Sequence, residues 1–121
     1  RQKNLMQNLC IAYQDILKKH KLYATSTTGQ MIEDVANLKI HKLLAAHFGG
    51  MQQMGSKISN NEIDLLIFLQ DPANKKRTPD FYNVLNLCDQ YNIPCATNLP
   101  TAEVLILALD RGDLDWRNMY K

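Results

Sequence analysis

Residues 63–69, IDLLIFL, constrain the fold more than any other segment, because only Asp64 interrupts a run that is apolar on both faces. Strands of parallel sheets are buried on both faces and carry such near-continuous apolar runs. Asp71 and Pro72 follow the run and end it. The sequence therefore predicts a central strand of a parallel sheet at residues 63–69.

Helical and extended patterns alternate along the rest of the chain. Leu5, Leu9, Ala12 and Ile16 recur at helical spacing within residues 4–20. Further helices are expected at 30–37, 52–59, 80–91 and after a capping Thr101, and further strands at 22–25, 39–45 and 93–97. This alternation predicts an α/β class with three layers and a mainly parallel sheet. Because doubly wound folds open with a buried strand, we expect a first strand before Arg1 that this sequence lacks.

Length and composition limit the classes of function. A chain of 121 residues, 45% apolar and 21% charged, predicts one soluble globular domain over residues 1–121. A net charge of +2 argues against a dedicated nucleic-acid binder. The basic segments 18–21 and 75–77 are interpreted as a solvated helix end and a solvated loop.

Location and metal binding are limited by what the sequence lacks. The longest apolar run is far shorter than the roughly twenty residues of a membrane span, and no signal peptide opens the chain. Cys10, Cys88 and Cys95 form no CxxC pair and suit a reducing cytoplasm. The three histidines are scattered, so we expect no membrane partner and no metal site.

Candidate ligand-binding residues follow the predicted strands, where open parallel sheets bind their ligands. Residues 25–29, TSTTG, join hydroxyls and backbone amides before a helix, a pattern that binds phosphate. Helix capping alone is the alternative explanation for one or two of these hydroxyls. Gly49-Gly50 is equally explained by an ordinary turn, and Asp71 and Asp80 by turn or helix caps.

Five blocks of sequence, taken together, resemble the methylglyoxal synthase family in order and spacing. The resemblance extends from Lys3 to about Leu109. It rests on LYATSTTG at 22–29, GGMQQMG at 49–55, IDLLIF at 63–68 with Asp71-Pro72, Pro79-Asp80, and NIPCATN at 92–98 with Thr101-Ala102.

This resemblance implies a Rossmann-like homohexamer that converts dihydroxyacetone phosphate to methylglyoxal and inorganic phosphate without a cofactor. Such a reaction needs a carboxylate that removes a proton from the carbon beside the carbonyl. It also needs donors that stabilise the resulting enediolate and a firm grip on the phosphate.

The resemblance also assigns the phosphate grip. Lys3 matches the family's phosphate-contacting lysine, and Thr25, Thr27 and Thr28 match its threonine loop, with Ser26 where glycine is usual. Ala45-Ala46 replace the serine-glycine pair that precedes the glycine turn, which removes a hydroxyl and adds a methyl group. A histidine-aspartate pair of the family falls before Arg1.

The catalytic carboxylate is replaced. The family motif is Gly-Gly-Asp-Gln-Gln, and its catalytic aspartate corresponds to Met51, whose thioether cannot act as a general base. Arg77 aligns with the family's substrate-orienting histidine, whereas the supporting acids Asp71 and Asp80 are retained.

Two hypotheses follow from these replacements. In the first, the chain is a methylglyoxal synthase in which Asp71 or Asp80 carries the proton transfer, or one altered from an active parent. In the second, the scaffold binds inorganic phosphate or a phosphorylated ligand, or nothing, and no longer catalyses.

Overall fold

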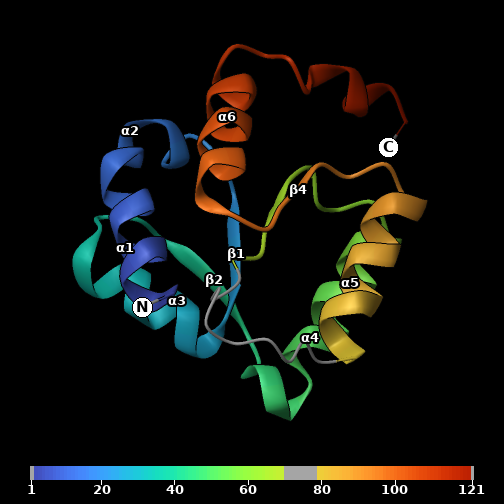
Figure 1. Ribbon diagram of the computed structural model, residues 1–121, viewed down its shortest axis with the longest axis horizontal. Coiled ribbons are helices and arrows are strands. Elements are labelled where there is room, and N and C mark those ends of the chain that lie inside the picture. The colour runs from blue at the N-terminus through green and yellow to red at the C-terminus, as the bar shows by residue number, and fades with distance from the viewer. Residues whose placement is uncertain (1, 70–78, 121) are drawn as a thin grey trace. The chain divides into compact units, whose positions relative to one another are not determined.

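The structure, a computed structural model, describes residues 2–69 and 79–120 (Figure 1). The chain divides into two compact units, Arg1–Gln53 and Met54–Lys121, and the division falls within one helix, α4 (Gly50–Ser59).

The first unit pairs two parallel strands and covers them with helices. The register sets Leu22 beside Ile40 and Thr25 beside Leu43, so the two strands end at the same level. Helix α3 packs against both strands and against α1. Its elements are α1 (Gln2–Ala12), α2 (Gln14–Leu17), β1 (Leu22–Thr25), α3 (Ser26–Val35), β2 (Ile40–Leu43), η1 (Ala46–Phe48) and the start of α4.

Two expected helices of this unit have different limits. The single helix predicted at 4–20 divides at Tyr13, whose dihedral angles (φ −113°, ψ 25°) leave the helical range. The helix predicted at 30–37 starts earlier, because α3 begins at Ser26 directly after β1, so residues 26–29 are helical and not a connection before the helix. Gly29 consequently lies inside a helix, where an added Cβ would be 3.0 Å from Lys42 Cγ. Its lack of a side chain therefore lets α3 pack closely on β2.

The second unit repeats the combination of parallel strands and helices. Leu66 pairs with Cys95 and Ile67 with Ala96, and α6 packs on β4. Its core holds fully buried side chains from three helices, among them Phe81, Ile58 and Ile106. Its further elements are β3 (Leu66–Ile67), α5 (Pro79–Gln90), β4 (Cys95–Ala96), α6 (Leu99–Asp110) and η2 (Asp115–Tyr120).

The strands of this unit are shorter than the predicted 63–69 and 93–97. The Leu66 amide donates to the Pro94 carbonyl (3.0 Å), but Pro94 has no N–H with which to extend the parallel ladder upstream of Leu66. Upstream, the Ile63 carbonyl accepts from the Arg117 side chain, and not from a strand. The predicted Thr101 cap is also wrong, since Asn98 is the N-cap of α6 and accepts from the Thr101 amide (3.0 Å).

Parallel strands joined through helices in both units establish an α/β, Rossmann-like organisation. Among the described residues, no helix is both long enough and apolar enough to cross a membrane.

Candidate functional site

Two connecting segments of the first unit begin side by side, at the carboxyl ends of β1 and β2. Thr25 and Leu43 are partners in the register, α3 follows Thr25, and residues 44–50 follow Leu43. Figure 1 shows both strands ending toward the bottom of the view, where η1 lies. The sequence predicts a ligand-binding site at this edge of the sheet.

The N-terminus of α3 presents hydroxyls and amides together. Thr25 is the N-cap residue (φ −62°, ψ 157°), but its hydroxyl makes no capping bond within the described structure and lies 3.5 Å from the Thr28 hydroxyl. The first amides of a helix have no partner inside the helix. Ser26, Thr27 and Thr28 form the first turn, which holds no acidic residue. The arrangement suits an anion, since the N–H groups and the helix dipole both favour negative charge.

The segment after β2 is a tight reversal. The Ala45 carbonyl accepts from the amides of Phe48 and Gly50, both at 2.9 Å. Gly49 adopts φ 103°, a left-handed conformation that glycine allows without steric cost. An added Cβ on Gly50 would lie 2.1 Å from the Leu44 carbonyl oxygen. The Gly49-Gly50 pair is therefore required by the backbone geometry of this turn.

Gln53 fixes the start of α4 to the end of β2. Its side-chain oxygen accepts from the Leu44 amide (2.6 Å), and its own amide donates to the Gly49 carbonyl (3.0 Å). Met51 lies in the same first turn of α4 and is half-buried. The sequence placed Gln53 in a motif, but did not reveal this positioning role.

A second contact that sequence reasoning missed joins α3 to β2. Glu33 accepts from the Ile40 amide (3.0 Å) and from the Lys42 ammonium (2.5 Å). The bond from Lys42, followed by that from Ile40, lowers the pKa of the Glu33 carboxyl. Glu33 thereby holds the side chain of Lys42, the one lysine within β2.

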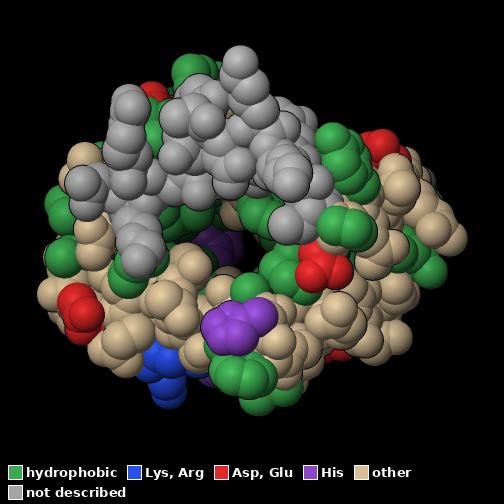
Figure 2. All heavy atoms as spheres, turned by 60° about the horizontal axis from the view of Figure 1, so that its bottom comes forward, with side chains coloured by type: hydrophobic (Ala, Val, Ile, Leu, Met, Phe, Trp, Pro, Cys, Tyr) green, Lys and Arg blue, Asp and Glu red, His purple; other side chains and the backbone are tan. Residues whose placement is uncertain are grey.

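The short helix η1 carries two aromatic rings. The rings of His47 and Phe48 lie 4.3 Å apart, and Phe48 is 70% exposed. Figure 2 turns the end that carries η1 toward the reader and shows histidine beside hydrophobic side chains on this face.

Four further site residues were predicted, namely Lys3, Asp71, Arg77 and Asp80. Lys3 belongs to α1, and Asp80 is half-buried in the first turn of α5 in the second unit. Asp71 and Arg77 lie outside the described residues. The first unit thus brings together the threonine loop and the turn, specifically Thr25, Ser26, Thr27, Thr28, Ala45, Ala46 and Met51.

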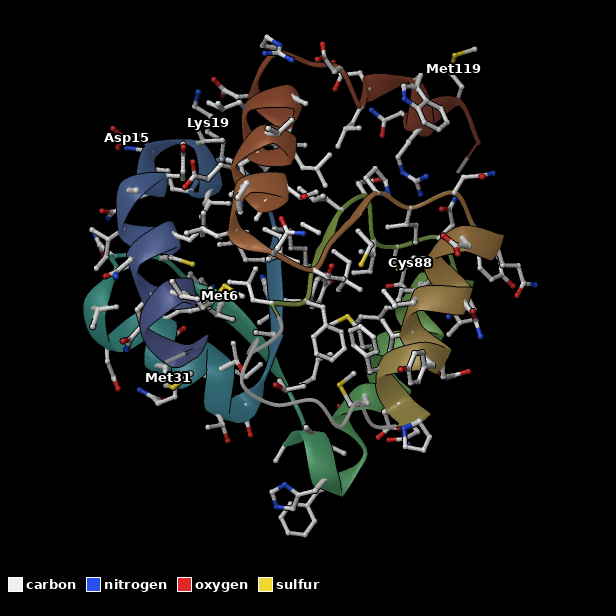
Figure 3. All side chains as sticks on the ribbon, in the orientation of Figure 1. Met6, Asp15, Lys19, Met31, Cys88 and Met119 are labelled. Atoms are coloured by element: carbon white, nitrogen blue, oxygen red, sulfur yellow. The ribbon has the colours of Figure 1, made fainter. Side chains whose placement is uncertain are left out.

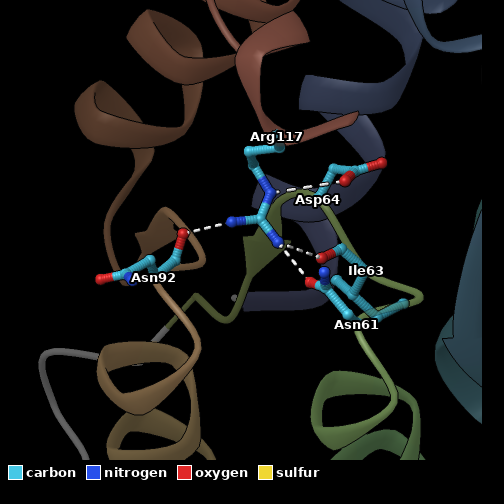
Figure 4. Close-up of polar contacts among 5 residues, drawn as sticks. All are labelled: Asn61, Ile63, Asp64, Asn92 and Arg117. Carbon is cyan, nitrogen blue, oxygen red and sulfur yellow. Dashed lines mark hydrogen bonds and ion pairs between the residues drawn. The ribbon is translucent and has the colours of Figure 1, made fainter. Parts of the chain in front are cut away.

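The second unit contains a buried arginine that sequence analysis did not single out. Arg117, only 3% exposed, donates to Asn61 Oδ1 (2.9 Å), to the Ile63 carbonyl (3.2 Å) and to the Asn92 carbonyl (Figure 4). It also pairs with Asp64 at 3.4 Å. These partners make Arg117 a structural link between η2 and the segments that precede β3 and β4.

No group of three or more histidine, cysteine, aspartate or glutamate side chains in the described ranges could hold a metal ion. Among the described residues, the first turns of α3 and α4 offer hydroxyls, backbone amides and a thioether.

Comparison with known proteins identifies the family. The family model described as the MGS-like domain matches residues 6–97. The methylglyoxal synthases of Caldicellulosiruptor saccharolyticus and Clostridioides difficile are 52% and 50% identical over 98% of this chain, which covers 85% and 88% of their lengths. The crystal structure of methylglyoxal synthase from Elizabethkingia anophelis NUHP1 superposes with a TM-score of 0.76 at 31% identity, covering 86% of this chain and 69% of that one. This chain therefore belongs to the methylglyoxal synthase family.

Proposed function

We propose that this member of the family binds phosphate or a phosphorylated ligand at the N-terminus of α3, and converts dihydroxyacetone phosphate weakly or not at all. The observation that carries the proposal is Met51 in the first turn of α4, at the motif position of the family's catalytic aspartate. Relatives about half identical to this chain bear the name methylglyoxal synthase, which supports the reaction class.

The phosphate grip is the part of the site that is supported best. The hydroxyls of Thr25 and Thr28 lie 3.5 Å apart at a helix N-terminus whose first turn is free of acidic residues. Phosphate oxygens would accept from these hydroxyls and from the first amides of α3. Ala45 and Ala46 offer no side-chain donor, and Lys3 would add a positive charge. We therefore expect binding to be weak but specific.

The base is the part that is missing. Removal of a proton from dihydroxyacetone phosphate requires a group that can accept it, and the thioether of Met51 has no useful proton affinity. The turn that carries residue 51 nevertheless keeps Gly49, Gly50 and the Gln53 bond to Leu44. A carboxylate at residue 51 would thus project from an intact turn. Arg77 in place of the orienting histidine would limit the recovered rate.

The family match crosses the division between the two compact units, which supports one functional domain over residues 1–121. We further propose a homohexamer in the cytoplasm that needs no cofactor and binds neither nucleic acid nor membrane. Light scattering tests the assembly, and a monomer at micromolar concentration would contradict it.

Phosphate binding tests the grip. At a hundredfold excess of ligand over its Kd, binding to the native state stabilises by about 2.7 kcal/mol. We expect the melting temperature to rise more with phosphate than with chloride of equal ionic strength. Thr28→Val should remove this difference, while Thr101→Val, an exposed threonine of the second unit, should leave it unchanged. Equal effects of phosphate and chloride would reject the site.

Restoring the carboxylate tests the base. Met51→Asp should raise turnover of dihydroxyacetone phosphate by roughly 10²–10⁴-fold, the usual contribution of a positioned general base. Ala45→Ser with Ala46→Gly should raise the rate of the Met51→Asp variant more than that of the unaltered chain, because residues that act as one unit are coupled. Background rates in all four combinations would place the defect outside this turn.

The alternative, an active synthase, is tested with the retained acids. If the unaltered chain turns over, Asp71→Asn and Asp80→Asn identify which carboxylate carries the proton. Loss of activity in either variant would replace the proposal of a missing base by one of a relocated base.

A further inference from the structure

The opposite end of β1 and β2 carries a basic cavity that the proposed function does not use. The cavity, about 400 Å³ in volume, lies within the first unit at the amino ends of the two strands. Two connections form its walls, the one from α2 to β1 and the one from α3 to β2. Residues 18–21, which the sequence alone suggested were a solvated helix end, contribute three of the lining side chains.

The ionisable side chains in the described lining are all basic. Lys18, Lys21 and Lys39 line the cavity together with His20 and His41, and no acidic residue is among the described residues of its lining. Asp15, outside the lining, pairs with Lys18 at 3.4 Å, with the two side chains 94% and 59% exposed. An exposed pair of this kind is weak, so a bound anion can replace it. The described lining therefore contains three lysines and two histidines with no carboxylate among them.

The cavity is also structurally supported. The Gln14 side chain donates to the Asn37 carbonyl (3.3 Å), which ties α2 to the connection between α3 and β2. Lys21 Nζ lies 5.3 Å from the centre of the Tyr23 ring, and that ring is 5.5 Å from the His41 ring. Leu38, which is 7% exposed, adds a buried apolar side chain to the lining. The charged groups are thus carried by elements held to one another.

We propose that this cavity binds a small polyanion of the pyrophosphate class, at a site separate from the carboxyl ends of the strands. The volume is near the lower end of the range for small-molecule sites, about 300–1,000 Å³. A single exposed charge pair is weak in water, so a ligand held here must engage several lysines at once. Pyrophosphate, free or as part of an organic molecule, carries the several charges that three lysines can match.

The three histidines of the chain allow the two sites to be distinguished in one experiment. His20 and His41 line the cavity, whereas His47 lies in η1 beside the candidate phosphate site. Inorganic pyrophosphate is titrated into the full chain while the imidazole NMR signals are followed at constant ionic strength. We expect saturable shifts of His20 and His41 at concentrations that leave His47 unmoved. Shifts of His47 alone would overturn this proposal and support the other site.

Matched lysine variants complete the test. Lys39 lines the cavity, whereas Lys19, labelled in Figure 3, does not. Lys39→Gln should weaken pyrophosphate binding by about fivefold or more, and Lys19→Gln, with the same loss of charge, by less than about twofold. Equal weakening in both variants would reduce the effect to general screening and reject the site. A single-stranded oligonucleotide that binds this cavity more tightly than pyrophosphate would reject the small-ligand class.

Discussion

Arg117→Met removes the buried guanidinium of the second unit while keeping a side chain of similar length. The native side chain is 3% exposed and donates to three residues of that unit, two in the segment before β3 and one before β4. Two of its partners, Asn61 and Asn92, have left-handed backbones (φ 58° and 56°). Left-handed residues other than glycine cost free energy and persist where neighbouring groups hold them. Arg117 is well placed to hold both.

The magnitude follows from the partners that would be left behind. The carbonyl of Ile63, a residue only 7% exposed, would lose its donor, and an unsatisfied buried acceptor costs about 1–3 kcal/mol. The bond to Asn61 at 2.9 Å involves a charged donor and adds roughly another 1.5 kcal/mol. Asp64 is 39% exposed, so its ion pair at 3.4 Å adds little. The expected loss of unfolding free energy is therefore about 3 kcal/mol.

Urea unfolding followed by fluorescence measures this loss, because Trp116 is the single tryptophan of the chain and stands beside Arg117. Arg111→Met is the matched control, since Arg111 is 67% exposed and pairs with Asp113 at the surface (2.8 Å). The control should lose less than about 1 kcal/mol. Equal losses in the two variants would refute the assignment of Arg117 as a buried structural link.

Three further predictions concern other groups. Gly50→Ala should destabilise the protein by about 1–3 kcal/mol or more, since the added Cβ would lie 2.1 Å from the Leu44 carbonyl oxygen. In the control Gly55→Ala, the added Cβ would meet only the end of the Leu87 side chain at 3.2 Å, and stability should change by less than about 1 kcal/mol. Thermal unfolding measures both variants. The pKa of the Glu33 carboxyl is lowered in the folded state, so the ionised carboxyl stabilises the fold above its unfolded pKa of about 4.3. This stabilisation is lost as the pH falls through the folded pKa. Glu33→Gln should therefore lower the melting temperature at neutral pH but not in strong acid. A hydrogen bond from Cys88 lowers the pKa of the Cys95 thiol, whereas burial raises the pKa of the Cys10 thiol to about 11. Mass spectrometry should therefore find Cys95 alkylated before Cys10 in the native protein. Cys88→Ala should slow the alkylation of Cys95.

The α/β class followed from the sequence because hydrophobic periodicity reflects burial directly. Residues 22–25 were predicted as a strand with their observed limits. The β3–β4 pair is shorter than predicted for two reasons that periodicity does not reflect. Pro94 has no N–H to donate to the neighbouring strand, and the Ile63 carbonyl accepts a hydrogen bond from the Arg117 side chain. The start of α3 was also missed, since hydroxyl residues favour turns as well as the N-termini of helices.

The site residues followed from motifs, but their supporting contacts did not. The hydroxyl run at 25–28 indicated its own chemistry because phosphate binding needs such groups at a helix N-terminus. Two supporting hydrogen bonds depend on side chains that β2 brings together, and no local sequence pattern predicts them. They are the bond from the Leu44 amide to Gln53 and the bond from Lys42 to Glu33. The basic cavity was likewise hidden, because its lysines come from two separate connections.

Methylglyoxal release from dihydroxyacetone phosphate by the unaltered chain, measured beside its Met51→Asp variant, tests the account most directly. With the thioether of Met51 in place of a base, we expect a rate at or near background for the unaltered chain. The variant should be faster by roughly 10²-fold or more. Turnover by the unaltered chain equal to that of the variant would contradict the claim that residue 51 limits catalysis.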